Sequence, residues 1–269
     1  MVFMDMYKKE KRDNMLLVID AGNTNIVFGI YDGEQLIATW RMATQQNKTA
    51  DEIGSFLLEL MRQWNIAKEQ IEDIIIASVV PSIMYSMEHC MRKYLGKKAI
   101  VVDDTMDLGI QIQLDNPKEV GADRLVNAAV AYELYGGPLI IIDFGTATTF
   151  CAVDKNGNYL GGAICPGIKV SVNALYQNAA KLPLIELVKP QEVIGRNTVA
   201  AMQSGVILGY TGQVEYLTRK FKEQIGEAKV IATGGLARMI ASDTDAIDIV
   251  DPQLTLKGLH MLYRKYTAK

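Results

Sequence analysis

The stretch MLLVIDAGNTN at residues 15–25 decides the fold, because it returns in altered form as LIIIDFGTAT at residues 139–148. In both copies a short apolar run, typical of a buried strand, ends in Asp-x-Gly and a threonine-bearing turn. Asp143 follows Asp20 by 123 positions, far more than the roughly 20 to 50 residues of a solenoid repeat. The repeat therefore predicts two similar domains that face each other across a cleft.

Both repeated stretches open a similar series of elements. Strands at 15–20, 26–31 and 35–42 come first, with a hairpin turn at Asp32-Gly33. Thr49 and Glu52 form a capping box that starts a helix. Further strands are expected at 73–79, 99–102, 139–145, 149–154, 159–164, 229–233 and 247–250, and further helices between Pro81 and Gly96, at 122–135, 168–180 and 198–224, from Leu236 and at 254–266. Strands that alternate with helices predict an α/β fold with mixed sheets flanked by helices.

The glycines and proline at 136–138 break the chain between the two series. We therefore predict an N-terminal domain at residues 15–135 and a C-terminal domain at 136–269. Residues 1–14, MVFMDMYKKEKRDN, are polar and charged, and we expect them to form a flexible extension.

Composition narrows the class of protein. The chain has 269 residues, of which 49% are hydrophobic, and its 28 basic and 31 acidic side chains give a net charge of −3. Such a balance offers no excess of positive charge to a nucleic acid, and no apolar run reaches the roughly 20 residues that cross a bilayer. Cys90, Cys151 and Cys165 are isolated in the sequence, as expected for reduced thiols. These features predict a cytoplasmic protein without nucleic-acid or membrane partners.

The doubled Asp-x-Gly turn suits a nucleotide phosphate. Glycine lets backbone amides approach phosphate oxygens, and the hydroxyls of Thr24, Thr146 and Thr148 can donate further hydrogen bonds. An aspartate at the end of a strand can hold a cation or its water shell against the phosphates. One Asp-x-Gly is usually only a turn, but two copies in the same context predict two hairpins that clamp one triphosphate.

Other nucleotide and hydrolase signatures are absent from the sequence. It contains no GxxxxGK[ST] phosphate loop and no GxGxxG fingerprint. It also lacks GxSxG and HExxH. These absences argue against P-loop kinases, dinucleotide-dependent oxidoreductases and the corresponding hydrolases.

Five motifs occur together in an order that resembles the type III pantothenate kinases, within the actin-like ATPase and sugar kinase superfamily. They are DAGNTN at 20–25, GADR at 121–124, DFGTAT at 143–148, GGAICPG at 161–167 and TGG at 233–235. The resemblance covers residues 15 to 266. It implies duplicated actin-like ATPase (ribonuclease H-like) domains with a nucleotide cleft between them. It also implies ATP-dependent phosphorylation of pantothenate to 4'-phosphopantothenate, the first step of coenzyme A biosynthesis, with Mg²⁺, a monovalent cation (K⁺ or NH₄⁺) and a homodimer with active sites near the interface.

The resemblance also implies residue roles. Asp123 is the catalytic base, which suits a carboxylate at the start of a helix because the helix dipole favours its ionised form. Pantothenate contacts fall on Gly121, Ala122, Asp123, Arg124 and Thr198. ATP contacts fall on Asp20, Ala21, Gly22, Asn23, Thr24, Asn25, Ile26, Val27, Thr146, Gly234 and Gly235. Asp20 would organise Mg²⁺ through water, and Asp143 would bind the monovalent cation.

Simpler explanations stay open for several of these residues. Acidic residues are common in a first helical turn, and Thr198 has the residue type of an N-cap. Gly234-Gly235 alone is a strand-to-helix turn. Residues 161–167 would shape the acceptor pocket or a subunit contact, and Cys165 receives no role. Leu114 stands where some family members carry a substrate-contacting tyrosine, which puts a polar pantothenate contact there in doubt.

Two other functions remain as alternatives. The same core supports other small-molecule kinases and phosphatases. Relatives of the family have also been described as transcription regulators, so a non-catalytic accessory factor is the third hypothesis, although the sequence shows no basic patch or DNA-binding helix pair.

Overall fold

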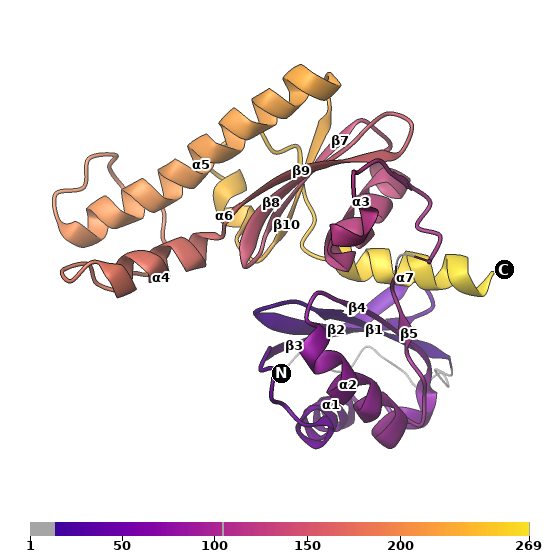
Figure 1. Ribbon diagram of the computed structural model, residues 1–269. Coiled ribbons are helices and arrows are strands. Elements are labelled where there is room, and N and C mark those ends of the chain that lie inside the picture. Colours follow the sequence, from indigo (N-terminus) through magenta and orange to yellow (C-terminus); the bar gives the residue numbers. More distant parts are fainter. Residues whose placement is uncertain (1–13, 104, 269) are drawn as a thin grey trace, which may run out of the picture. The chain divides into compact units, whose positions relative to one another are not determined.

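The computed structural model describes residues 14–103 and 105–268 (Figure 1). The extension expected at residues 1–14 lies, apart from Asn14, outside the described residues. The strands are β1 (Met15–Ala21), β2 (Asn25–Asp32), β3 (Gln35–Ala43), β4 (Ile71–Ser78), β5 (Ile100–Val101), β6 (Gln111–Ile112), β7 (Leu139–Phe144), β8 (Ala147–Val153), β9 (Asn158–Pro166), β10 (Lys229–Gly234) and β11 (Ile249–Val250). The helices are α1 (Ala50–Gln63), α2 (Pro81–Cys90), α3 (Ala122–Tyr135), α4 (Ile168–Asn178), α5 (Thr198–Ile225), α6 (Ala237–Ala241) and α7 (Leu254–Thr267), with short 3₁₀ turns at Lys68–Gln70 and Pro117–Glu119 and a π-helical turn at Met91–Leu95.

The chain forms two compact units. The first contains the residues up to Met106, the short segment Gly121–Asp123 and the C-terminal residues from Thr255. The second contains Asp107–Val120 and Arg124–Leu254. The units thus differ in their limits from the domains expected at 15–135 and 136–269, because most of α3 groups with the second unit and α7 with the first. The division at residues 135 and 136 stays a prediction.

The first unit is built on the five-stranded sheet β3-β2-β1-β4-β5. β2 and β3 run antiparallel to their neighbours, whereas β4 and β5 run parallel to β1. β1 is a continuous apolar run because both of its faces are covered. Helices α1 and α2 lie on one face and α7 on the other (Figure 1). The first repeated stretch is therefore the central strand of a three-layered unit.

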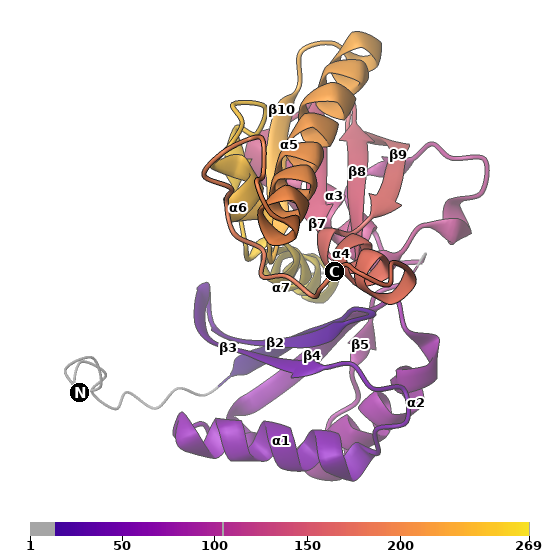
Figure 2. The same cartoon turned by 90° about the vertical axis from the view of Figure 1, so that its left-hand side faces the viewer.

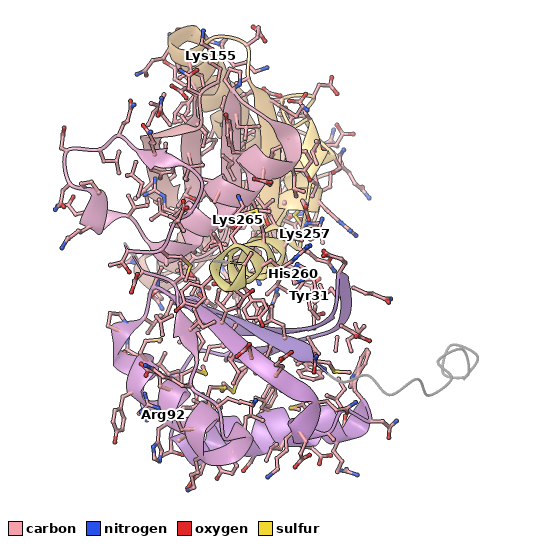
Figure 3. The ribbon with its side chains drawn as sticks, turned by 90° about the vertical axis from the view of Figure 1, so that its right-hand side faces the viewer. Tyr31, Arg92, Lys155, Lys257, His260 and Lys265 are labelled. Atoms are coloured by element: carbon pink, nitrogen blue, oxygen red, sulfur yellow. The ribbon has the colours of Figure 1, made fainter. Side chains whose placement is uncertain are left out.

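Helix α7 is fastened to the first sheet by polar and aromatic contacts. The ring of His260 stacks on Tyr31 of β2 at a centroid distance of 4.2 Å (Figure 3). Tyr263 donates its hydroxyl hydrogen to Asp73 Oδ2 at 2.7 Å, and Arg264 pairs with Glu34. The last helix of the chain thus packs on its first strands.

The second unit repeats the first sheet. Its strand order β11-β10-β7-β8-β9-β6 contains β9-β8-β7-β10-β11, which matches β3-β2-β1-β4-β5 strand for strand and in direction. β7, the second repeated stretch, occupies the place of β1. β6 is an addition, paired in parallel with β9. The predicted duplication is confirmed at the level of topology.

Helices cover both faces of the second sheet. Ile140, Ile142, Phe144 and Phe150 share a core with side chains of α4, α5 and α6. α3 lies on the other face, where Arg124 reaches Cys151 of β8 (Figures 1 and 2). The predicted α/β class with mixed sheets flanked by helices is confirmed. Among the described residues, no helix has both the length and the apolar character that crossing a membrane requires.

Most predicted boundaries hold to within two residues, and their local causes are visible. Glu52 N–H donates to the Thr49 hydroxyl while the Glu52 carboxylate accepts from Thr49 N–H, so the capping box is formed. Gly33 has φ +57° in its hairpin turn, and Gly96 has φ +68° where the second helical stretch ends. Strand β6 was not predicted, and β5 and β11 are shorter than expected, with two residues each.

Candidate active site

The first Asp-x-Gly turn joins β1 to β2 and is held by backbone hydrogen bonds. Gly22 N–H donates to Asn25 O at 3.0 Å. Thr44, just after β3, closes the turn from the side, since its N–H donates to Thr24 O at 2.9 Å and its hydroxyl to Gly22 O at 2.7 Å. Asn23 and Thr24 are exposed at the tip. The predicted ATP contacts from Asp20 to Val27 therefore form one ordered hairpin with an open tip.

The second turn, between β7 and β8, is built in the same way. Gly145 N–H donates to Ala147 O at 3.1 Å, and Gly167, just after β9, donates its N–H to Thr146 O at 3.1 Å. Gly145 and Thr146 are exposed. Gly167 thus corresponds to Thr44 of the first unit. Sequence reasoning missed Thr44, although its place after the third strand, like that of Gly167, was a signal.

Each hairpin carries its aspartate near the carboxyl end of a central strand. Asp20 is paired with Ala77 of β4, and Asp143 with Thr233 of β10. Both side chains are partly buried. Ligands of open α/β sheets bind outside the carboxyl ends of the strands, so both aspartates lie at the edge where a phosphate-bound cation is expected.

Thr148 does not fit its predicted role. Its side chain is completely buried, and its hydroxyl has no hydrogen-bond partner in the part of the chain that the structure describes. Thr148 lies two positions before Phe150 in β8, on the core face of the sheet. The expectation that its hydroxyl donates to a phosphate is therefore wrong, whereas Thr24 and Thr146 are exposed in their turns.

Asp123 lies close to the first hairpin. It is in the first turn of α3. A methyl carbon built on Gly121 would lie 2.6 Å from Asp123 Oδ1 and 3.0 Å from Val79 Cγ1. Val79 follows β4, and its N–H donates to Ala21 O at 3.1 Å. The structure thus brings Gly121, Ala122 and Asp123 to the edge of the first sheet that also carries Asp20.

Arg124, the next residue, groups with the second unit. Its Nε donates to Cys151 Sγ at 3.3 Å, and its guanidinium carbon lies 6.0 Å from the centre of the Tyr159 ring. Both partners are buried, so Arg124 packs over the sheet face that α3 covers. Its predicted contact with pantothenate stays a prediction.

Gly234 and Gly235 follow β10 beside the second hairpin. Gly234 has φ +92°, and a methyl carbon there would lie 2.6 Å from Asp143 Oδ1 and 2.7 Å from the Phe144 backbone. A side chain at position 234 would therefore displace either the aspartate or the strand. Gly234 leaves space for Asp143 at the end of the sheet.

Thr198 is the first residue of α5 and is exposed. The helix is capped by Asn197, whose side chain accepts from Ala200 N–H at 2.9 Å. The alternative that Thr198 is the N-cap is therefore wrong, and its hydroxyl is not used in that way. Its predicted contact with pantothenate stays a prediction.

Two features of the GGAICPG segment bear on the acceptor. Leu114 Cδ2 lies 3.0 Å from the position of a methyl carbon on Gly161, whose φ is +101°, so an apolar side chain packs where some relatives carry tyrosine. Burial raises the pKa of the Cys165 thiol, which keeps it protonated and argues against a nucleophile.

The structure assembles the predicted residues in two groups. The first hairpin and Gly121–Asp123 belong to the first unit, and the second hairpin, Arg124, Thr198 and Gly234-Gly235 to the second. No group of three or more His, Cys, Asp or Glu residues in the described ranges could hold a metal ion alone. Single carboxylates at the two Asp-x-Gly turns suit cations that are held mainly by ligand oxygens and water.

Three solved structures from other proteins share the fold of this chain. A protein from Campylobacter jejuni described as a Baf family transcriptional activator is 18% identical, with a TM-score of 0.60 over 94% of this chain and 100% of its own. Component A of (R)-2-hydroxyglutaryl-CoA dehydratase from Acidaminococcus fermentans is 17% identical, with a TM-score of 0.50 over 96% and 100%. A Sinorhizobium meliloti protein described as a 2-dehydro-3-deoxygalactonokinase is 12% identical, with a TM-score of 0.51 over 93% and 96%. The fold is thus that of the actin-like ATPases and sugar kinases.

A match to a protein family narrows the assignment beyond the fold. Residues 16–220 match the sequence model of the type III pantothenate kinases, and the chain belongs to that family. The protein is therefore a kinase, that is, a phosphotransferase that uses ATP.

Proposed function

We propose that this kinase transfers the γ-phosphoryl group of ATP to the primary hydroxyl of pantothenate, forming 4'-phosphopantothenate, the first step of coenzyme A biosynthesis. One observation carries the proposal: Gly121–Asp123 of the GADR motif lies beside the end of β4, next to the Asp-x-Gly hairpin of the same unit. A carboxylate beside a phosphate-binding turn is what phosphoryl transfer to an alcohol requires.

The proposed mechanism divides the work among the residues. Asp123 accepts the proton of the attacking hydroxyl. Backbone amides at the tips of the two Asp-x-Gly turns and the exposed hydroxyls of Thr24 and Thr146 orient the phosphates. Gly234 and Gly235 let the nucleoside lie against the backbone, and Arg124 and Thr198 bind the acceptor.

Asp20 and Asp143 would hold the cations. Their partly buried carboxylates at the strand ends fit Mg²⁺ held through water at Asp20 and K⁺ or NH₄⁺ at Asp143. Cations in these places would neutralise phosphate charge during transfer. We also propose that the enzyme works in the cytoplasm, where ATP is supplied.

A homodimer is part of the proposal. Nine exposed large apolar side chains come from residues 164–199. This stretch comprises the end of β9, α4, the following segment and the start of α5, which lie together in the second unit (Figure 2). The side chains are Ile164, Val170, Leu175, Tyr176, Leu184, Val188, Val193, Ile194 and Val199. We call this set the apolar surface. Large apolar patches of this kind mark interaction sites, and Thr198 within it connects the surface to acceptor binding.

ATP consumption across a panel of acceptors tests the proposal. Purified protein is assayed with pantothenate, hexoses, acetate or no acceptor, with and without K⁺. We expect turnover with pantothenate alone, and product mass identifies 4'-phosphopantothenate. Turnover with another acceptor but not with pantothenate would replace the proposal by a different small-molecule kinase.

The same assay addresses the regulatory alternative. The likeness to the Campylobacter jejuni protein shows only a shared fold at 18% identity. Nucleotide binding without turnover on any acceptor would support a non-catalytic accessory factor. Turnover with pantothenate would exclude it as the sole function.

A further inference from the structure

Gly121 lies against the carboxylate of the proposed base. Of its surroundings, Asp123 Oδ1 comes closest, 2.6 Å from where a methyl carbon would be, and Asp123 Cγ lies at 3.7 Å. Carbon and oxygen atoms that are not bonded do not approach to 2.6 Å, so the carboxylate occupies the space that any side chain at position 121 would fill. The carboxylate of Asp123 is thus folded back over Gly121.

The backbone of Gly121 does not itself require glycine. Its φ is outside the positive range that Gly33, Gly96 and Gly234 adopt, so alanine can take the same conformation without strain. The nearest atoms are side-chain atoms, those of Asp123 and, at 3.0 Å, Val79 Cγ1. An added methyl group would therefore displace side chains rather than the main chain.

Gly234 provides the contrast. It also leaves space for an aspartate oxygen, Asp143 Oδ1 at 2.6 Å, but it has φ +92° and lies 2.7 Å from the Phe144 backbone. Alanine at position 234 would disturb the strand as well as the aspartate. Gly121 is therefore the position at which the direction of a site carboxylate can be tested separately from the fold.

We propose that Gly121 is a positioning residue: by lacking a side chain it lets the Asp123 carboxylate fold back toward Val79 and the end of β4, where the attacking hydroxyl must be deprotonated. The inference rests on the proposed function for its kinetic consequence, and it differs from the role that the family resemblance implies, a direct contact between Gly121 and pantothenate. A direct contact would act on substrate affinity, whereas positioning acts on proton transfer.

A double-mutant cycle separates the two roles. We expect Gly121→Ala to lower kcat by about 10- to 100-fold, since a displacement of about 1 Å can cost that much, with little change in KM for ATP or pantothenate. Asp123→Asn removes the base. If Gly121 acts through Asp123, the Gly121→Ala, Asp123→Asn variant is no slower than Asp123→Asn alone. The proposal would be overturned if the double variant lost kcat by the product of the two single losses. It would also be overturned if Gly121→Ala raised the KM for pantothenate and left kcat unchanged.

Gly205→Ala is the matched control, because nothing outside the neighbouring residues and backbone of its own helix, α5, lies within 4 Å of the corresponding methyl position. It should keep wild-type kinetics. Should Gly121→Ala melt at a much lower temperature, adding Val79→Ala gives room on the apolar side and leaves only the carboxylate to move. The double variant must then fold and still lose kcat; recovery of wild-type kcat would assign the effect to Val79 and overturn the proposal.

Crystal structures of the wild type and of Gly121→Ala, without ligands, give a readout that does not depend on activity. We expect the Asp123 carboxylate to rotate away from position 121 in the variant while the backbone of α3 stays in place. An unmoved carboxylate would overturn the positioning role. A wild-type protein that is inactive on pantothenate would instead contradict the proposed function and leave this structural result standing.

Discussion

Thr148 shows how strand geometry decides what a motif residue can reach. It belongs to the second Asp-x-Gly motif, yet it shares the core face of β8 with Phe150, and its hydroxyl is buried without a partner among the described residues. An unsatisfied buried hydroxyl destabilises the folded state. We predict that Thr148→Val raises the free energy of unfolding by about 1 kcal/mol, measured by urea unfolding, and leaves kcat unchanged. A loss of ATP affinity would show that the hydroxyl does reach the nucleotide.

Asp143 is the residue at which dependence on a monovalent cation should be lost. Its carboxylate lies at the end of β7 beside Gly234, which leaves it room. We predict that K⁺ stimulates the wild type, and that Asp143→Ala lowers kcat on the order of tenfold or more because charge stabilisation is lost, with no response to K⁺. The measurement is kcat of the wild type and of Asp143→Ala, each with K⁺ and with a large organic cation in its place. Asp115→Ala, an exposed change, is the control, and K⁺ stimulation that survives in Asp143→Ala would assign the cation to another residue.

At the scale of elements, the sequence predicts those helices and strands whose signals lie within or next to the element itself. β1 and β7 follow from apolar runs that end in glycine turns, and α1 from the capping box at Thr49, because each signal lies within a few residues of the element. Strand β6 was not predicted because it has only two residues and its partner strand lies far along the chain. Its Ile112 pairs with Tyr159 of β9. The packing of α7 on the first sheet is equally non-local. The carboxyl-end positions of Asp20 and Asp143 were predictable, whereas the contact of Gly121 with Asp123 needed coordinates.

We expect His260 to make the packing of α7 on the first sheet sensitive to pH. Its Nε2–H donates to Gly33 O at 2.8 Å, its ring stacks on Tyr31, and the charged groups near it are Glu34 from the β2–β3 turn and Arg264 from α7. Burial lowers the pKa of His260 below its usual value, against the opposite effects of Gly33 and Glu34. The folded state therefore binds the proton less readily than the unfolded chain. The packing of neutral His260 therefore contributes fully to the free energy of unfolding above the unfolded pKa of about 6.5. This contribution is lost as the pH falls below that value.

We predict that the wild type loses more unfolding free energy between pH 7 and pH 5 than His260→Gln. Glutamine retains a donor for Gly33 O but does not titrate. Urea unfolding at several pH values, followed by tryptophan fluorescence, measures the difference. Parallel pH profiles for the two proteins would show that His260 does not couple α7 to pH.

At the scale of the whole molecule, we expect the apolar surface to form the contact between two copies of the chain. Nine of the fourteen large hydrophobic side chains that are exposed in the described part of the chain fall between residues 164 and 199, and Val193 and Ile194 are 73% and 82% exposed. Burying such side chains in a subunit interface contributes roughly 25 cal/mol per Å² of apolar area. A second copy of the chain presents the same surface, as twofold dimers require.

We predict that the wild type is a dimer in solution and that Ile194→Asp shifts it to the monomer, because a charge inside the interface leaves an unpaired carboxylate without water. Light scattering coupled to size exclusion gives the mass of each. Tyr85→Asp is the matched control, since Tyr85 is an equally exposed apolar side chain, 81%, on α2 of the other unit. If active sites lie near the interface, Ile194→Asp also raises KM for pantothenate while the variant keeps its melting temperature. A dimer that persists in Ile194→Asp would place the interface elsewhere, and a monomeric variant with unchanged kinetics would separate assembly from acceptor binding.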